Sequence, residues 1–291
     1  MALADHLNEG DIAKLSRIRT AERRASADHR TGDFKSVHAG DGIEFFEHKR
    51  YAPGMDVRAI DWRRYARTDE LHVKRYEREE SRSMAVILDV SASLGKKTVA
   101  GPAKSSAAAK LALGAAYIAV NNGLPVSFMA IADTVRDTVH ASAHFSQLAA
   151  IADIIDGTPF SARSSAASFA ALIPPACPVR SDAYIISDFL FMDNDALAPL
   201  FTSLHARRVR FRLLQVLSRE ETDLPFTGDM MLIDAETKAS CMIAPALMRG
   251  TYARALADLT NALTEAAASH GGRYRLCRTG GALIDDLIAV V

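Results

Sequence analysis

The chain has 291 residues, of which 49% are hydrophobic and 24% are charged, a length that suits one large α/β domain with an appendage or two small domains. Its 35 basic and 35 acidic side chains balance, so the chain as a whole lacks the positive charge that is typical of nucleic-acid-binding domains. Three widely spaced cysteines, with neither a signal-peptide pattern nor a long apolar run, predict a soluble, cytoplasmic protein.

The first 80 residues are predicted to form an N-terminal extension that packs on the main domain. Residues 1–30 are polar and rich in arginine, which predicts a helical arm with a solvated basic face. Residues 40–80 contain aromatic and β-branched residues and a turn at Pro53 and Gly54, which favour short strands and hairpins over a long helix. The single tryptophan, Trp62, is expected to anchor this segment to the sheet by burying its ring.

Residues 81–291 alternate between strand patterns and helix patterns and are predicted to form the main domain. Strands are predicted over 85–88, 125–132, 183–186, 209–217 and 273–277, with an edge strand or hairpin partner over 133–140 and a hairpin over 229–244. Helices are predicted over 103–120, 146–155, 168–173, 195–207, 249–269 and 283–290. Because strands that alternate with helices form right-handed crossovers, we expect an α/β fold with a doubly wound, mainly parallel sheet.

The stretch from residue 84 to residue 93, MAVILDVSAS, is a buried-strand pattern that ends in an Asp-x-Ser-x-Ser cluster. Asp89, Ser91 and Ser93 thus lie near the carboxyl end of a central strand, where open α/β sheets bind their ligands. A carboxylate and two hydroxyls on one tight loop offer oxygen ligands to a hard cation such as Mg²⁺ or Mn²⁺. The same residues also suit a helix cap, and this short motif alone does not separate the two interpretations.

A second strand pattern, over residues 183–186, ends in Ser187 and Asp188. Two neighbouring strands that end in aspartate would direct both carboxylates toward one crevice at the edge of the sheet. Asp188 is also able to cap the following helix, but the repeated pattern favours a shared cation site.

These features together resemble the von Willebrand factor A fold and its metal-ion-dependent adhesion site, in which a strand ending in Asp-x-Ser-x-Ser is followed by a long helix and by a later strand ending in Ser-Asp. The upstream segments RYAPGMDVRAIDWRRYAR and KRYEREE resemble the bacterial family catalogued as domain of unknown function 58. The downstream segments SREETDLPFTGDMMLIDAET and RYRLCRTGGALIDDL resemble the same family. The similarity covers nearly everything after about residue 35.

The resemblance implies that Asp89, Ser91 and Ser93 form the first metal loop and that Asp188 supplies a later carboxylate through water. It also implies a threonine on a loop between these two positions, opening a short helix. That threonine is not at the expected spacing here. The hydroxyl would come instead from one of three residues in the corresponding loop, namely Ser165, Ser164 or Thr158.

Two lysines, Lys96 and Lys97, follow the first loop closely, and an ammonium group near the site would disfavour a cation. Members of the family are often linked to MoxR-type AAA+ ATPases, where this fold is thought to act as an adaptor or substrate recogniser. The resemblance therefore implies a MoxR-type ATPase, or another protein that offers an acidic side chain, as the partner.

A phosphatase of the haloacid dehalogenase type is the nearest enzymatic alternative, because it also places an aspartate at the end of the first strand. That chemistry uses a second carboxylate two residues later as general acid, and this position is Ser91. Nucleic-acid binding through the basic N-terminal segment is a further alternative. We expect instead a non-enzymatic interaction module in which Mg²⁺ or Mn²⁺ links Asp89, Ser91, Ser93 and Asp188 to an acidic side chain of a partner protein.

Overall fold

The structure is a computed structural model that describes residues 3–18, 39–40, 44–52, 55, 60–77, 82–96, 98, 101–191 and 195–291. The chain divides into two compact units. The larger unit comprises residues 1–23 and 82–291, and the smaller unit comprises residues 24–81. The first 23 residues are grouped with the larger unit, and the packing of an N-terminal extension on the main domain stays a prediction.

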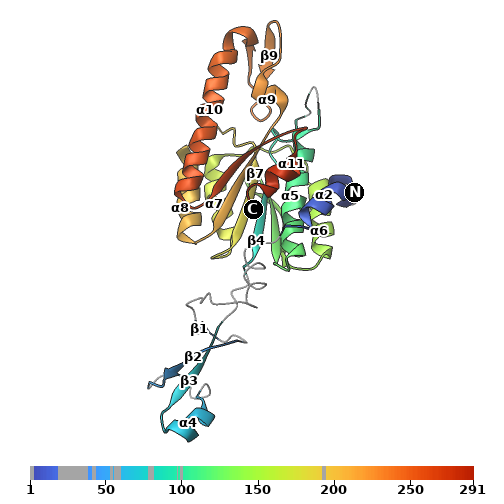
Figure 1. Ribbon diagram of the computed structural model, residues 1–291. Coiled ribbons are helices and arrows are strands. Elements are labelled where there is room, and N and C mark those ends of the chain that lie inside the picture. Colours follow the sequence, from blue (N-terminus) through green and yellow to red (C-terminus); the bar gives the residue numbers. More distant parts are fainter. Residues whose placement is uncertain are drawn as a thin grey trace. The chain divides into compact units, whose positions relative to one another are not determined.

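The larger unit is built on a sheet in which the described residues form six strands, in the order β11-β8-β7-β4-β5-β6 (Figure 1). The strands are β4 (Met84–Asp89), β5 (Val126–Ile131), β6 (Val135–Ser142), β7 (Asp182–Ser187), β8 (Arg210–Leu217) and β11 (Arg273–Arg278). All neighbouring pairs are parallel except β5 and β6, which are antiparallel. The structure therefore confirms the predicted mainly parallel α/β sheet, with β6 as its edge strand.

Helices cover both faces of this sheet, which explains why the central strands are apolar throughout. Helices α5 (Lys104–Asn121), α6 (Ser146–Gly157) and α11 (Leu283–Ile288) pack on one face, and α7 (Ala166–Ala176), α8 (Ala198–Ala206) and α10 (Pro245–Ser269) pack on the other. Successive residues of a strand face opposite ways, so β4 supplies Val86 and Leu88 to the first core and Ala85 and Ile87 to the second.

Helix α7 is longer than the prediction of residues 168–173, because it continues through Pro174 and Pro175. The two prolines lie in the last turn of the helix, where each removes one main-chain N–H donor, and the helix ends one residue later at Ala176. Pro174 is buried.

The N-terminal residues contribute to the core of the larger unit through two short helices, α1 (Leu3–His6) and α2 (Glu9–Leu15). Leu7 and Leu15 are fully buried in the same hydrophobic cluster as α5. Asn8 caps α2 reciprocally with Asp11, whose carboxylate also pairs with Lys110 of α5 at 2.6 Å. Residues 3–18 thus contain short helices, as predicted for the arm, and they pack through Leu7 and Leu15 while Arg17 is exposed. The arginines between residues 19 and 30 lie outside the described residues.

The smaller unit contains three described strands, β1 (Ala39–Gly40), β2 (Glu44–Arg50) and β3 (His72–Glu77), in the antiparallel order β1-β3-β2. The predicted short strands are thus present, together with a short helix, α4 (Trp62–Thr68). The expected turn at residues 53–54 lies outside the described residues.

Trp62 is not buried within the smaller unit, and its predicted role as an anchor to the main sheet stays a prediction. Asp61 caps α4 by accepting hydrogen bonds from the N–H groups of Arg63 and Arg64, which places Trp62 at the first helical position. From there its ring lies 60% exposed and makes an edge contact with Tyr65, with the ring centroids 6.2 Å apart. Helix α4, which the sequence analysis did not predict, directs the indole outward.

Between β8 and α10 the chain forms α9 (Arg219–Asp223) and a hairpin of β9 (Met230–Ile233) and β10 (Ser240–Ile243), as predicted for residues 229–244. These two strands form a two-stranded sheet of their own within the described part of the chain. Figure 1 shows the hairpin and the first part of α10 at the top of the larger unit. Of the helices in the described ranges, none is both long enough and apolar enough to cross a membrane.

Candidate cation-binding site

The register of the central strands brings the two predicted acidic positions to the same edge of the sheet. Leu88 of β4 pairs with Ile186 of β7, so Asp89 lies beside Ser187 and one residue from Asp188. The carboxylate of Asp89 accepts a hydrogen bond from the Ser187 hydroxyl at 2.6 Å and another from the Ser91 N–H at 2.9 Å. The structure therefore brings the ends of β4 and β7 together, as the repeated strand pattern predicted.

The carboxyl group of Asp89 is fully buried and experiences a second negative charge. Burial, followed by the charge of Asp188, raises the pKa of Asp89 from 3.8 to about 7. The hydrogen bonds from Ser187 and Ser91 lower this pKa and offset only part of the shift. In the described part of the chain no basic side chain forms an ion pair with Asp89, so an ionised Asp89 needs another source of positive charge.

The loop after β4 holds its two serines against each other. The Oγ atoms of Ser91 and Ser93 are 2.9 Å apart, with Ser91 fully buried and Ser93 partly exposed. The N–H of Ala92 donates to the carbonyl of Ala162 at 2.8 Å, which fixes the loop against the segment before α7. Gly95 is required here because a Cβ atom would collide with the backbone and side chain of Phe160. Asp89, Ser91 and Ser93 thus form one compact oxygen cluster.

Asp188 forms an ion pair with a buried lysine, and its predicted role as a carboxylate that reaches a cation through water stays a prediction. Lys104, in the first turn of α5, is 2% exposed, and its Nζ lies 2.9 Å from Asp188 Oδ2 and 2.7 Å from Glu221 Oε1. Burial lowers the pKa of Lys104, but the charges of Asp188 and Glu221 outweigh it and raise the pKa overall. The ammonium group therefore stays charged and neutralises Asp188 from within the protein.

Local hydrogen bonds fix the other partners in this ion-pair network. Glu221 forms a capping box with Ser218 at the start of α9, with the Ser218 N–H donating to Glu221 Oε2 at 2.8 Å. The side-chain amide of Gln215 donates to the Asp188 carbonyl at 2.7 Å, and the Tyr274 hydroxyl donates to the Gln215 carbonyl oxygen at 2.5 Å. Asp188 and Glu221 are therefore held in place on two sides of the lysine.

Of the three residues proposed for the missing threonine, Ser165 uses its hydroxyl in another contact. Ser165 is exposed and caps α7, where its Oγ accepts a hydrogen bond from the Ser168 N–H at 3.1 Å. Thr158 follows the end of α6. The N–H of Ser164 donates to the carboxylate of Glu236, at the turn of the β9–β10 hairpin, over 3.3 Å. Lys96, which was expected to oppose a cation, is exposed, and Lys97 lies outside the described residues.

Sequence reasoning missed two residues of this site, Lys104 and Glu221. The Ser218–Glu221 capping box is readable as Ser-x-x-Glu, but it predicts only the start of a helix. Lys104 is a single lysine at the beginning of an alanine-rich helix, and nothing in its local pattern indicates that it is buried. Lys104 is separated by 84 residues from Asp188, so only the fold could reveal the pair.

The donor set of the crevice fits a hard cation better than a soft one. The available groups are the carboxylate of Asp89 and the hydroxyls of Ser91 and Ser93, and oxygen ligands of this kind suit magnesium or manganese. Among the described residues, no group of three or more His, Cys, Asp or Glu side chains is arranged to hold a metal ion. A cation here would therefore be bound mainly by the β4 loop and would keep open coordination positions.

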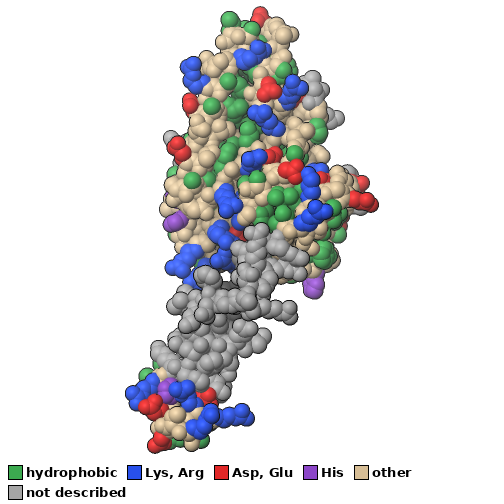
Figure 2. All heavy atoms as spheres, in the orientation of Figure 1, with side chains coloured by type: hydrophobic (Ala, Val, Ile, Leu, Met, Phe, Trp, Pro, Cys, Tyr) green, Lys and Arg blue, Asp and Glu red, His purple; other side chains and the backbone are tan. Residues whose placement is uncertain are grey.

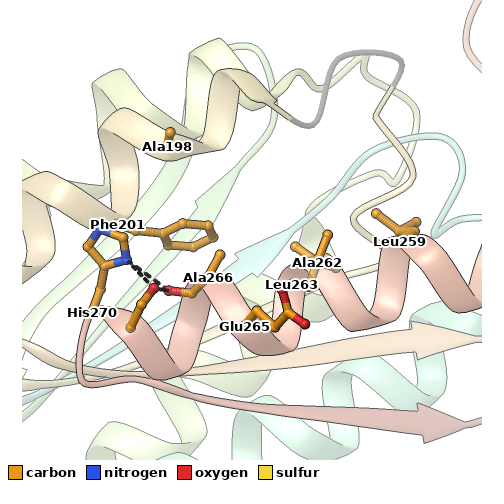
Figure 3. Close-up of a pocket in the computed structure, with 9 residues that line it drawn as sticks. Ala198, Phe201, Leu259, Ala262, Leu263, Glu265, Ala266 and His270 are labelled. Atoms are coloured by element: carbon orange, nitrogen blue, oxygen red, sulfur yellow. Dashed lines mark hydrogen bonds between the residues drawn. The ribbon is translucent and has the colours of Figure 1, made fainter.

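A groove lies between α8 and α10, and it shares no residues with the candidate cation site. This groove has a volume of about 580 Å³ and is lined mainly by apolar side chains, including Phe201, Leu259 and Leu263 (Figure 3). Its histidine, His270, is engaged with the backbone, because its Nδ1 lies 2.8 Å from the carbonyl oxygen of Ala266. The groove offers apolar contact area and little chemistry.

Comparison with known proteins gives one family and several relatives. The family described as "Protein of unknown function DUF58" matches residues 47–262. An uncharacterized protein of Mycobacterium tuberculosis and another of Mycobacterium bovis are each 32% identical to this chain over 235 residues, which cover 78% of this chain and 71% of theirs.

Two solved structures are also similar to the chain. One is a conserved hypothetical protein, BatB, from Bacteroides thetaiotaomicron, with a TM-score of 0.46 and 12% identity. The other is an aerotolerance-related membrane protein from Bacteroides fragilis, with a TM-score of 0.45 and 13% identity. The alignment with each structure covers 72% of this chain and 96% of the solved chain.

Proposed function

This chain belongs to the DUF58 family of proteins of unknown function, and we propose that it is a non-enzymatic protein–protein interaction module of the von Willebrand factor A type. The module uses a divalent cation, Mg²⁺ or Mn²⁺, held by Asp89, Ser91 and Ser93 at the carboxyl edge of the sheet. The observation that carries this proposal is the fully buried carboxylate of Asp89, which has no basic partner in the described residues and lies beside two converging hydroxyls.

The charges around the crevice support a bound cation. Asp89 ends β4 and Asp188 follows the adjacent strand β7, and the single ammonium of Lys104 is shared between Asp188 and Glu221. One positive charge thus faces three carboxylates, which leaves Asp89 uncompensated. A divalent ion beside Asp89 would restore the balance and would relieve the repulsion that raises the pKa of this group.

The same ligand set explains why the module would bind an acidic partner. One carboxylate and two neutral hydroxyls leave a divalent cation with a net positive charge and with coordination positions filled by water. Since Asp188 is already bound to Lys104, it can reach the ion only through water or through its second oxygen. A carboxylate from another protein would complete the coordination, and we propose a MoxR-type AAA+ ATPase or a protein that it acts on as the source.

The competing phosphatase reaction is less well supported by the geometry. It requires a general acid two residues after the strand-end aspartate, and that residue is Ser91. The Ser91 hydroxyl is buried and lies 2.9 Å from the Ser93 hydroxyl. This environment suits a metal ligand or a structural group better than a general acid. A hydroxyl of ordinary acidity does not protonate a leaving group near neutral pH.

Calorimetric titration of MgCl₂ and MnCl₂ tests the proposed cation site. We expect the wild-type chain to bind either ion, and we expect Asp89→Ala to bind at least about tenfold more weakly because the charged ligand is lost. Ser93→Ala, at a partly exposed position, should weaken binding less. Asp153→Ala, which removes an exposed carboxylate on α6, is the matched control and should bind as the wild type does.

Equal binding heats for the wild type and Asp89→Ala would show that Asp89 does not hold a cation, provided that circular dichroism shows both chains to be folded. Steady hydrolysis of p-nitrophenyl phosphate that disappears in Asp89→Ala would favour the phosphatase alternative instead.

A further inference from the structure

Hydrogen bonds order the turn of the β9–β10 hairpin, which carries the acidic residue Glu236. Asp234, at the start of the turn, accepts hydrogen bonds from the N–H groups of Glu236 at 2.8 Å and Thr237 at 2.6 Å. The turn closes when the N–H of Asp234 donates to the carbonyl of Ala239 at 2.8 Å. Lys238 has a φ of +62°, a left-handed conformation that tightens the turn. Glu236 therefore projects from an ordered turn.

The side chain and the backbone of Glu236 both contact the loop that supports the cation cluster. Its Oε2 accepts a hydrogen bond from the Ser164 N–H at 3.3 Å, and its carbonyl accepts one from Arg163 Nε at 3.3 Å. The same loop contains Ala162, which forms a bridge with Ser91. Only one short segment thus separates the hairpin turn from the oxygen ligands of the site.

The negative charge of Asp188 acts on the carboxyl group of Glu236. Burial raises the pKa of Glu236, the hydrogen bond from Ser164 lowers it, and the negative charge of Asp188 raises it again, with a net upward shift. Glu236 is thus an acidic side chain held against the loop that supports the oxygen cluster, and neither strand pattern predicts it.

We propose that Glu236 is the chain's own acidic ligand for the cation at Asp89, and that it occupies the position that a partner's carboxylate must take. This inference rests on the proposed cation site. The partner would then bind by replacing Glu236, so its apparent affinity would depend on how readily the hairpin moves aside. Glu236 would also exclude weak carboxylate ligands, because a tethered group competes at a high effective concentration.

The hairpin is suited to such a displacement. Its two strands pair with each other, and the side chains of Met231, Ile233 and Met242 are 57%, 52% and 68% exposed, so moving the hairpin would remove little apolar surface from the core. Figure 2 shows hydrophobic side chains among charged ones on the upper part of the larger unit, where Figure 1 places the hairpin. A partner that displaces Glu236 could cover these apolar side chains.

The variant Glu236→Gln tests the proposal, because it keeps the size of the side chain and its acceptor for the Ser164 N–H while it removes the charge. In the first measurement, hydrogen exchange of residues 230–243 is compared with and without saturating MgCl₂. The wild-type hairpin should become at least about threefold more protected when Mg²⁺ is added, and the variant should show no change with Mg²⁺. Asp229→Asn, which removes an exposed carboxylate just before β9, should behave as the wild type does.

The second measurement uses acetate as the carboxylate probe and Mn²⁺ as the bound ion. A proton of a ligand that coordinates Mn²⁺ relaxes faster, so the methyl resonance of acetate reports whether a coordination position is open. With saturating Mn²⁺, acetate should broaden at least about threefold more with Glu236→Gln than with the wild type, because the tethered competitor is gone.

The outcomes separate this inference from the proposed function. If Mg²⁺ binds to the wild type and not to Asp89→Ala, but Glu236→Gln leaves hairpin exchange and acetate broadening unchanged, the inference about Glu236 is wrong and the cation site stands. If the wild type binds neither Mg²⁺ nor Mn²⁺, both proposals are wrong.

Discussion

Lys104→Met should lower the free energy of unfolding of the larger unit by about 3–5 kcal/mol, which is the cost of breaking a buried ion pair by removing one partner. Methionine has nearly the length of lysine, so the packing of the stem in α5 is largely kept. The loss comes from the carboxylates of Asp188 and Glu221, since Asp188 is 3% exposed and would remain charged without its cation. The melting temperature should fall by roughly 10 °C for a unit of this size.

Urea unfolding followed by circular dichroism in the far ultraviolet is the suitable measurement for Lys104→Met. Tryptophan fluorescence would report on the smaller unit, because Trp62 is the only tryptophan in the chain. Lys110→Met is the matched control on the same helix. Lys110 pairs with Asp11 at 2.6 Å but is 25% exposed, so its loss should cost no more than about 1 kcal/mol. Similar losses in the two variants would contradict the ion-pair account.

Magnesium should partly restore the stability of Lys104→Met if the proposed cation site is correct. Removing the ammonium frees Asp188 to act as a second charged ligand, so the variant should gain more stability from saturating MgCl₂ than the wild type does. Identical gains in both chains would mean that Lys104 and the cation do not share Asp188.

Asp182→Asn should lower the free energy of unfolding by a similar amount, about 3–5 kcal/mol near pH 7. Asp182 begins β7 and accepts hydrogen bonds from Arg210 at 2.9 and 2.7 Å and from Arg212 at 2.7 Å. Arg212 is 9% exposed, lies 5.0 Å from the centroid of the Tyr184 ring and donates to the Val290 carbonyl. Loss of the carboxylate charge would therefore leave a buried guanidinium without its counter-ion.

The effect of Asp182 should depend on pH. Burial acts to raise the pKa of Asp182, but the hydrogen bonds from Arg210 and the charge of Arg212 outweigh it and lower the pKa below 3.8. A carboxyl whose pKa is lower in the folded state stabilises the protein above its ordinary pKa, and this contribution is lost as the pH falls through the folded-state value. The difference between the wild type and Asp182→Asn should thus be largest near neutral pH and should shrink below about pH 4.

Unfolding in urea at several pH values checks this dependence on Asp182. Asp137→Asn, at an exposed position of β6, is the control and should differ from the wild type by less than about 0.5 kcal/mol at every pH. A difference between the wild type and Asp182→Asn that stays constant down to pH 2.5 would show that the carboxylate acts through packing and not through its charge.

The sequence by itself was sufficient to predict the sheet, its helices and one half of the candidate site. Strands β4 and β7 are short, mainly apolar runs that are buried on both faces. Strand β4 ends in Asp89 and β7 is followed by Asp188, so the central position of both strands and the edge at which their acidic residues lie can be predicted from the local sequence. The Asp89, Ser91 and Ser93 cluster lies on one five-residue loop, and its oxygen atoms converge as the spacing predicted.

Only the tertiary structure decided which groups meet that cluster, because the identity of a distant partner depends on how the elements pack and leaves no trace in the local pattern. Lys104 lies 84 residues before Asp188, and Glu236 lies 72 residues after Ser164, yet both pairs are in contact. Periodicity predicts that a side chain is buried, but it does not predict which opposite charge compensates it. The same reason explains Trp62, whose large ring suggested burial until helix α4 directed it outward.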